Sequence, residues 1–234
     1  MKFNEFDKFF SLLFFIVLLI ELLSYPIHGL SNLHFVAKPL LIISLIYFVY
    51  VKRFELKKRS RRLMLWALFL SLTGDTLILF ETIVENSILF FMGILVFIIV
   101  LMLYTNVFFI KRNKSIKSFH FAIVLISFMT LLFSTLWNSL NHMLIPIALY
   151  ALVLFVLNYS ASLRCFNVSK MSFRLVLIGT LLMLVSNTFV VINKFYFPFS
   201  WSHELIMSTY GISQYCIVFG VIKQNNSYFK KFNI

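Results

Sequence analysis

The sequence predicts an all-α, polytopic transmembrane bundle of about eight helices. Of its 234 residues, 61% are hydrophobic and only 12% are charged, and the mean hydropathy is +0.95. The apolar residues form runs of about 18–24 residues, the length that an α-helix needs to cross a hydrocarbon core of about 30 Å. The runs lack the alternation of β-barrel strands, and most basic residues lie between them. These observations exclude an ordinary soluble domain.

Eight apolar runs account for most of the chain, and we treat residues 1–234 as a single transmembrane domain. The first run lacks a small-residue cleavage site and is followed by Ser24-Tyr25-Pro26, so it predicts an uncleaved helix and not a signal peptide. Pro39 and Pro146 lie near the starts of the second and sixth runs. In chain order, the expected helices cover about 9–27, 33–51, 62–80, 87–110, 119–137, 142–163, 172–193 and 203–222.

The basic residues predict an orientation. Nineteen of the 21 Lys and Arg residues belong to the segments before the first helix and after the second, fourth, sixth and eighth helices, including Arg62 and Arg174 at the starts of the helices that follow. The other two, Lys38 and Lys194, lie within or at the ends of spans. Because cytoplasmic loops are enriched in Lys and Arg, this alternation places both termini in the cytoplasm. A missed or additional helix would break the alternation, so the charges support the helix count independently of hydropathy.

The net charge of +13 does not indicate nucleic-acid binding, because the cations occupy short loops that meet anionic lipid headgroups. Two cysteines are too few for a disulfide framework or a zinc site. We find no metal-ligand spacing, phosphate-binding glycine loop or nucleophile elbow. We therefore expect membrane lipids as partners and neither a cofactor nor a metal, and we leave the oligomeric state open. Four histidines are expected at the outer membrane interface: His28, His34, His142 and His203.

Polar residues inside spans are the candidates for function, because a charge there costs at least about 2.5–3.5 kcal/mol on insertion scales. Asp75, a mid-span carboxylate that follows a glycine, favours a functional role. If Lys38 is considered by itself, snorkelling explains it, because its long side chain would let the ammonium group reach the outer interface. Tyr150 and Gln214 fall near the bilayer centre. The predicted topology gathers four polar side chains in the outer half of the bilayer, which suggests one cavity there: Glu21, Lys38, Asp75 and Asn187.

Several of these residues lie in short motifs. Ala37-Lys38-Pro39-Leu40 and Ser71-Leu72-Thr73-Gly74-Asp75-Thr76-Leu77 resemble the "KP" and "LxGDxxL" signatures of the YhhN family, whose members are eight-helix membrane proteins and include lysoplasmalogenases. The resemblance covers roughly residues 36–222. Further similar positions follow in the family's order: Phe91, Gly93, Phe97 and Tyr104 on the fourth helix, Pro146 and Tyr150 on the sixth, Gly179, Ser186 and Asn187 on the seventh, and Tyr210 and Gln214 on the eighth.

The resemblance implies hydrolysis of the vinyl ether of a lysoplasmalogen, which yields a fatty aldehyde and a glycerophospho-headgroup. This reaction needs a general acid and a positioned water. By resemblance, Asp75 is the candidate acid or water-orienting base, Glu21 is a possible second carboxyl group, and Lys38 could meet the lipid phosphate. Four further side chains would orient the water and the headgroup: Tyr104, Tyr150, Asn187 and Gln214.

Two positions bear on whether the chain is catalytic. Leu101 stands where the family commonly has histidine, so an imidazole that could move protons is missing. Asn187 stands where the family has Asp or Asn, so it lies within the family's range but removes a possible second carboxylate. Loss of that histidine favours a non-catalytic, lipid-binding or structural member as the competing class. A small transporter ranks last. Such proteins use broken helices around a midplane site, whereas Pro39 and Pro146 both lie near helix starts. For the membrane we expect a bacterial inner (plasma) membrane.

Overall fold

The predicted all-α architecture is confirmed in a computed structural model of the chain. The structure describes residues 4–24, 31–84, 87–115, 118–140 and 143–224, and these contain eight helices and no strand. In chain order the helices are α1 (Glu5–Ser24), α2 (Ser31–Val51), α3 (Lys58–Val84), α4 (Ser87–Ile110), α5 (Phe119–Leu140), α6 (Leu144–Ser162), α7 (Lys170–Phe195) and α8 (Ser202–Ile222).

Seven of these helices, α2 to α8, are long and apolar enough to cross a membrane. The first helix, α1, has 20 residues and carries charged side chains near both ends, among them Asp7 and Glu21. Residues 25–27 of the predicted first span lie outside the described residues. Exposed large apolar side chains occur on each of the eight helices, as expected where the surroundings are lipid tails: Phe9, Val36, Trp66, Ile88, Val124, Ile145, Ile178 and Leu205 are examples.

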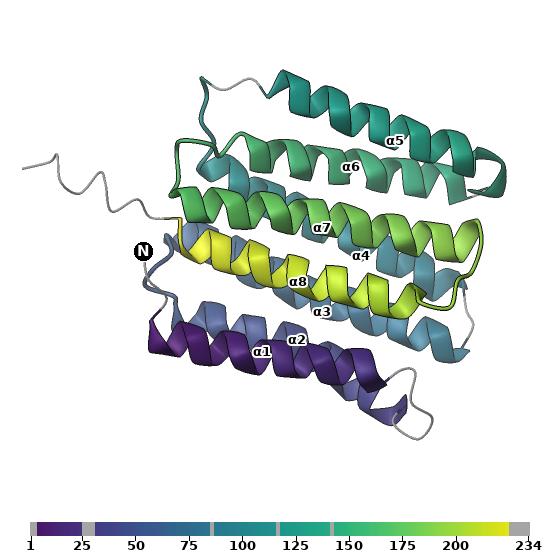
Figure 1. Cartoon of the computed structure of the whole chain (residues 1–234), viewed down its shortest axis with the longest axis horizontal. Coiled ribbons are helices and arrows are strands. Elements are labelled where there is room, and N and C mark those ends of the chain that lie inside the picture. The colour runs from purple at the N-terminus through teal and green to yellow at the C-terminus, as the bar shows by residue number, and fades with distance from the viewer. Residues whose placement is uncertain (1–3, 25–30, 85–86, 116–117, 141–142, 225–234) are drawn as a thin grey trace, which may run out of the picture.

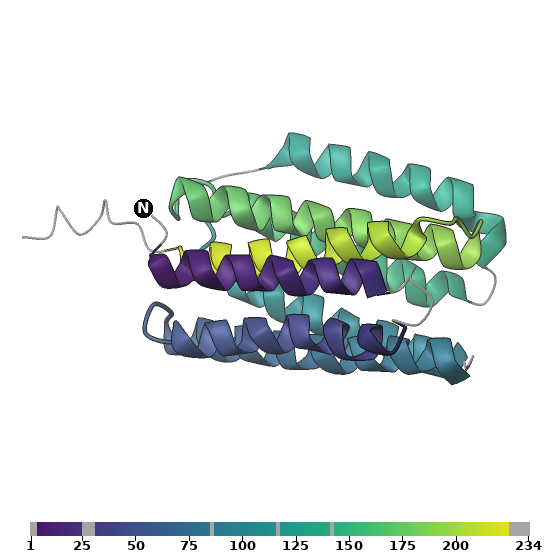
Figure 2. The same cartoon turned by 60° about the horizontal axis from the view of Figure 1, so that its bottom comes forward.

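The helices form one bundle in which α8 is the most enclosed element (Figures 1 and 2). The helix α7 packs most extensively on α8, and α3 packs on α4. At Gly220 of α8, an added Cβ would lie 2.6 Å from Val176 on α7, so glycine permits this close approach. In both views α5 lies at the edge of the bundle, and its buried residues are Leu125, Leu136 and Leu140. The edge helix therefore contributes little to the centre.

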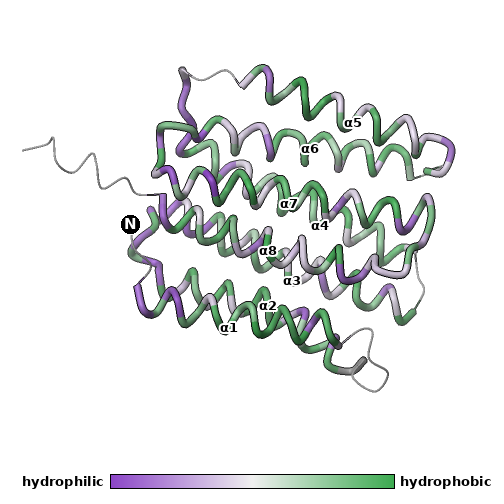
Figure 3. Tube along the Cα trace, in the orientation of Figure 1, coloured by the Kyte–Doolittle hydropathy of each residue, from purple (hydrophilic) through white to green (hydrophobic). Residues whose placement is uncertain are grey.

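Hydrophilic stretches gather at one end of the bundle, which we call the inner end, although others occur along the helices and at the opposite end (Figure 3). The inner end holds the start of α1, the basic connections after α2, α4 and α6, and the end of α8. The opposite end, here called the outer end, holds the end of α1 and the starts of α2 and α8. The arrangement agrees with the alternation of cations along the sequence. The cytoplasmic location of the inner end stays a prediction.

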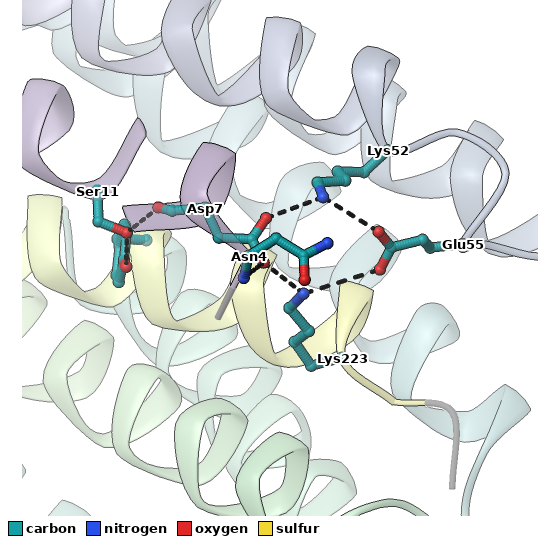
Figure 4. A network of polar contacts seen from close by, with 7 residues as sticks. Asn4, Asp7, Ser11, Lys52, Glu55 and Lys223 are labelled. Carbon is teal, nitrogen blue, oxygen red and sulfur yellow. Dashed lines mark hydrogen bonds and ion pairs between the residues drawn. The ribbon is translucent and has the colours of Figure 1, made fainter. Parts of the chain in front are cut away.

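A buried ion cluster joins α1, α2 and α8 at the inner end (Figure 4). The Asp7 carboxylate is fully buried, and it accepts a hydrogen bond from Lys223 Nζ at 2.6 Å and lies 2.9 Å from Lys52 Nζ. Glu55 lies 3.2 Å from Lys52 on the other side. Burial opposes ionisation, but the hydrogen bonds from Lys223 and Lys52 outweigh it and lower the pKa of Asp7 below its ordinary value.

An aromatic stack lies next to this cluster, in the part of the core formed by α1, α2 and α8. The ring centroids of Phe10 and Phe48 are 4.3 Å apart, those of Phe48 and Phe219 are 4.4 Å apart, and Tyr215 stacks on Phe219 at 4.2 Å. These rings come from α1, α2 and α8, and such pairs add about 0.5–1.5 kcal/mol beyond area burial. The stack therefore packs these three helices against one another beside the ion cluster.

Candidate functional site

A cavity of about 120 Å³ lies among six helices, α2, α3, α4, α6, α7 and α8. Its volume is well above the roughly 10–15 Å³ that one water molecule needs. The wall is mostly apolar, with side chains such as Phe90, Phe97, Met183 and Val190. Six polar side chains interrupt it: Lys38, Asp75, Tyr150, Ser186, Asn187 and Tyr210. A mostly apolar wall with a few convergent polar groups is typical of a ligand site.

Asp75 stands on the cavity wall and is almost completely buried. Gly74 precedes it on α3, and a Cβ at that position would lie 2.8 Å from the ring of Phe97. Glycine thus lets α4 approach α3 closely beside the carboxyl group. Tyr210 Oη donates a hydrogen bond of 2.7 Å to Asp75 Oδ2. The carboxyl group is therefore held in one orientation by a partner 135 residues further along the chain.

Behind Asp75, a chain of hydrogen bonds crosses from α4 to α8. Tyr104 Oη donates to Gln214 Oε1 at 2.7 Å, and Gln214 Nε2 donates to Tyr210 Oη at 3.2 Å. Tyr210 in turn donates its hydrogen bond to Asp75, where this series of hydrogen bonds ends. Tyr104 and Gln214 are buried and do not line the cavity. Their role in this arrangement is to position Tyr210, and through it the carboxyl group.

A second polar pair lies on the wall formed by α6 and α7. Tyr150 Oη donates a hydrogen bond of 2.6 Å to Asn187 Oδ1. Asn187 Nδ2 in turn donates to the backbone oxygen of Met183 at 2.7 Å, which fixes the amide. Both side chains line the cavity. The pair offers polar atoms to a ligand or a water molecule on the side of the cavity away from α2.

Lys38 supplies the cation of the cavity wall. It is half-buried on α2 and directly precedes Pro39. Among the residues that the structure describes, no carboxylate lies within 4.0 Å of its ammonium group. An ammonium group without a close counter-ion beside an apolar space is suited to an anionic group that enters from outside.

The structure does not bring Glu21 into the cavity with Asp75. Glu21 is fully buried on α1, where its Oε1 lies 2.8 Å from His34 Nδ1 and 3.8 Å from His203 Nε2. The sequence suggested Glu21 as a second carboxyl group of the site, but Glu21 does not line the cavity. It meets His34 and His203 at the outer end, where the sequence had placed these two histidines, because α1, α2 and α8 converge there.

Four of the seven candidate residues therefore share one cavity wall, namely Lys38, Asp75, Tyr150 and Asn187, while Tyr104 and Gln214 lie behind it. Tyr210, which contacts Asp75 directly, was not among the candidates. The sequence feature that could have identified Tyr210 is its spacing of four residues from the candidate Gln214, because this spacing puts both side chains on one face of a helix.

The fold and the cavity define the class of the protein: an integral, multi-pass membrane protein with a polar site buried among its helices. In a comparison with protein families, the YhhN family model matches residues 33–221 of the chain. The chain belongs to the YhhN family. No curated protein and no solved structure matches the chain.

Proposed function

We propose that the protein hydrolyses the vinyl ether bond of a lysoplasmalogen-type lipid in the cavity. One observation above all carries the proposal: Asp75, fixed by Tyr210, stands on the same apolar wall as Lys38, Tyr150 and Asn187. Membership of the YhhN family adds support, since that family includes lysoplasmalogenases.

A single-chain phospholipid matches the distribution of polar and apolar groups in the cavity. The apolar side chains accept the first carbons of the vinyl ether chain, whose tail stays in the bilayer. Lys38 on α2 would pair with the phosphate of the headgroup. With the phosphate there, the ether bond lies between Lys38 and the deeper polar groups, where Asp75 can reach it.

In the proposed reaction, a protonated Asp75 gives its proton to the vinyl carbon remote from the ether oxygen, which leaves an oxocarbenium ion. A water molecule attacks the carbon bound to that oxygen, and a proton of the water returns to Asp75. The resulting hemiacetal breaks its carbon–oxygen bond to give the fatty aldehyde and the free glycerol hydroxyl group. The net change is the consumption of one water molecule. The carboxylate formed in the first step lies beside the cation that it stabilises.

The test is an assay of aldehyde release by the purified, full-length protein in lipid nanodiscs. We expect aldehyde from a lysoplasmalogen and none from the matching lysophospholipid with a saturated ether, which cannot be protonated on carbon in this way. If the protein releases no aldehyde from the vinyl ether, the catalytic proposal is wrong.

Tyr210→Phe tests the hydrogen bond that orients the acid. The change removes the donor to Asp75 and leaves the ring in place, and we expect aldehyde release to fall about tenfold or more. Steady-state kinetics should show the loss in kcat with little change in KM, because Tyr210 acts on the acid more than on the lipid. An unchanged kcat would show that the Asp75 carboxyl group needs no such support.

A second candidate function is a non-catalytic, lipid-binding role, and Leu101 is the observation that favours it. Leu101 is buried on α4, one turn before Tyr104, where the family commonly has histidine. If this role is correct, the natural protein releases no aldehyde but binds the lipid, and Leu101→His gains turnover. If the hydrolase proposal is correct, the natural protein is already active. Comparing both proteins in the aldehyde assay separates the two.

A further inference from the structure

Glu21, His34 and His203 form a cluster that the cavity does not use. They come from three helices that meet at the outer end: Glu21 lies in the last turn of α1, His34 lies in the first turn of α2, and His203 is the second residue of α8. Glu21 is fully buried, and the side chains of His34 and His203 are only 10% and 14% exposed. Such burial is unusual for three ionisable groups near the end of a bundle.

The potential ligand atoms of the cluster converge. Glu21 Oε1 lies 2.8 Å from His34 Nδ1 and 3.8 Å from His203 Nε2, and one ligand atom from each residue lies within 4.8 Å of the other two. In a tetrahedral site with bonds of about 2.0–2.1 Å, ligand atoms are about 3.3 Å apart. The first two distances lie on either side of this value. Small side-chain rotations would bring all three atoms to one ion.

From this geometry we propose that Glu21, His34 and His203 bind a divalent transition-metal ion of the Zn²⁺ class. Two imidazole nitrogens and one carboxylate oxygen suit Zn²⁺ and Co²⁺ better than Mg²⁺ or Ca²⁺, which prefer oxygen ligands. Three protein ligands leave the fourth position to a water molecule or another small ligand. The proposal replaces the expectation from the sequence that the chain holds no metal.

The ion would hold α1, α2 and α8 together at the outer end, because each helix supplies one ligand. Its position is one turn of α2 away from Lys38, which lines the cavity, and one turn of α8 away from Met207, which also lines it. The bound metal therefore fixes the two helices that frame this side of the cavity. This role does not depend on the hydrolase proposal.

The competing explanation is a simple ion pair between Glu21 and a protonated His34, with His203 as a neighbour. An ion pair predicts no metal affinity. The experiment is a titration of the chelator-treated, full-length protein in nanodiscs with Zn²⁺ and with Co²⁺, followed by elemental analysis and thermal unfolding. We expect one Zn²⁺ per chain, a visible Co²⁺ absorption band and a rise in Tm when Zn²⁺ is added.

The variants make the assignment specific. His34→Ala and His203→Ala should weaken Zn²⁺ binding at least about tenfold and abolish the rise in Tm. The matched control is His120→Ala, which removes an exposed histidine of α5 and should bind Zn²⁺ as the natural protein does. Because an alanine variant can fail to fold, His203→Cys keeps a metal ligand in place, and its Co²⁺ complex should gain a thiolate charge-transfer band.

A natural protein that binds no Zn²⁺ at stoichiometric concentration would overturn the proposal. The same conclusion would follow if His120→Ala lost as much affinity as His203→Ala, or if the Co²⁺ complex of His203→Cys showed no thiolate band.

Discussion

Replacing Asp75 with asparagine is expected to lower aldehyde release from a lysoplasmalogen at least about a hundredfold, since loss of a general acid costs about 10²–10⁴ in rate. The two side chains have the same size, and the amide oxygen of the Asp75→Asn variant can still accept the hydrogen bond from Tyr210 Oη. The amide, however, has no acidic proton to give to carbon. The fold should persist, so the loss should appear in kcat at unchanged Tm.

Glu81→Gln is the matched control for this change. Glu81 is a largely buried carboxylate on the same helix, where it pairs with Lys194 and does not line the cavity. Its neutral variant should keep aldehyde release within about twofold of the natural protein. If Asp75→Asn and Glu81→Gln lose activity alike, or if Asp75→Asn remains fully active, Asp75 is not the acid.

Asp7→Asn is expected to produce the largest loss of stability, about 3–5 kcal/mol in the free energy of unfolding. The natural carboxylate lies between the ammonium groups of Lys52 and Lys223, both of which are mostly buried. An amide leaves those two cations close together without their shared counter-ion. The cluster also ties the start of α1 to the ends of α2 and α8, so its loss should weaken the whole inner end. Chemical unfolding in detergent measures the effect.

The control for Asp7 is Glu5→Gln, two residues earlier in the first turn of the same helix. Glu5 pairs with Lys8, but both side chains are largely exposed, and the expected effect is at most about 1 kcal/mol. An equal effect of both variants would contradict a special role for the buried cluster.

The Asp7 contribution should depend on pH in a defined direction. Despite burial, the lysine hydrogen bonds lower the pKa of Asp7 in the folded protein below 3.8, its ordinary value. The group therefore stabilises the fold fully above that ordinary value, and the contribution is lost as the pH falls through the folded-state pKa. The difference in unfolding free energy between the natural protein and Asp7→Asn should be constant near neutral pH and shrink below about pH 4.

The helices and their order follow from the sequence because hydrocarbon thickness fixes the length of an apolar run, and short basic loops fix the alternation. The same topology placed Lys38, Asp75 and Asn187 at similar depths, and these three side chains do share one cavity wall. Depth was sufficient there because the helices are close to parallel. Polar side chains at the same depth in a membrane bundle almost always face its interior, because the lipid around it offers them no partners.

Lateral contacts between helices could not be predicted in the same way. Spans such as α3 and α4 have no clearly more apolar face, so the sequence pattern does not show which face of these helices turns inward. The contact between Tyr210 and Asp75 joins positions 135 residues apart, and the approach of His203 to Glu21 depends on the packing of α8 beside α1. Asp7 precedes the predicted first span, and its burial depends on the far end of the chain.

The most direct test of the central claim is hydrolysis of a lysoplasmalogen by the purified protein in D₂O, with immediate reduction of the product and mass spectrometry. Protonation of the vinyl ether on carbon predicts a fatty alcohol that carries one deuterium from the solvent on the carbon next to the former carbonyl, together with an intact glycerophospho-headgroup. Absence of aldehyde-derived product, or a product without that deuterium, would contradict the proposed intramembrane vinyl ether hydrolase.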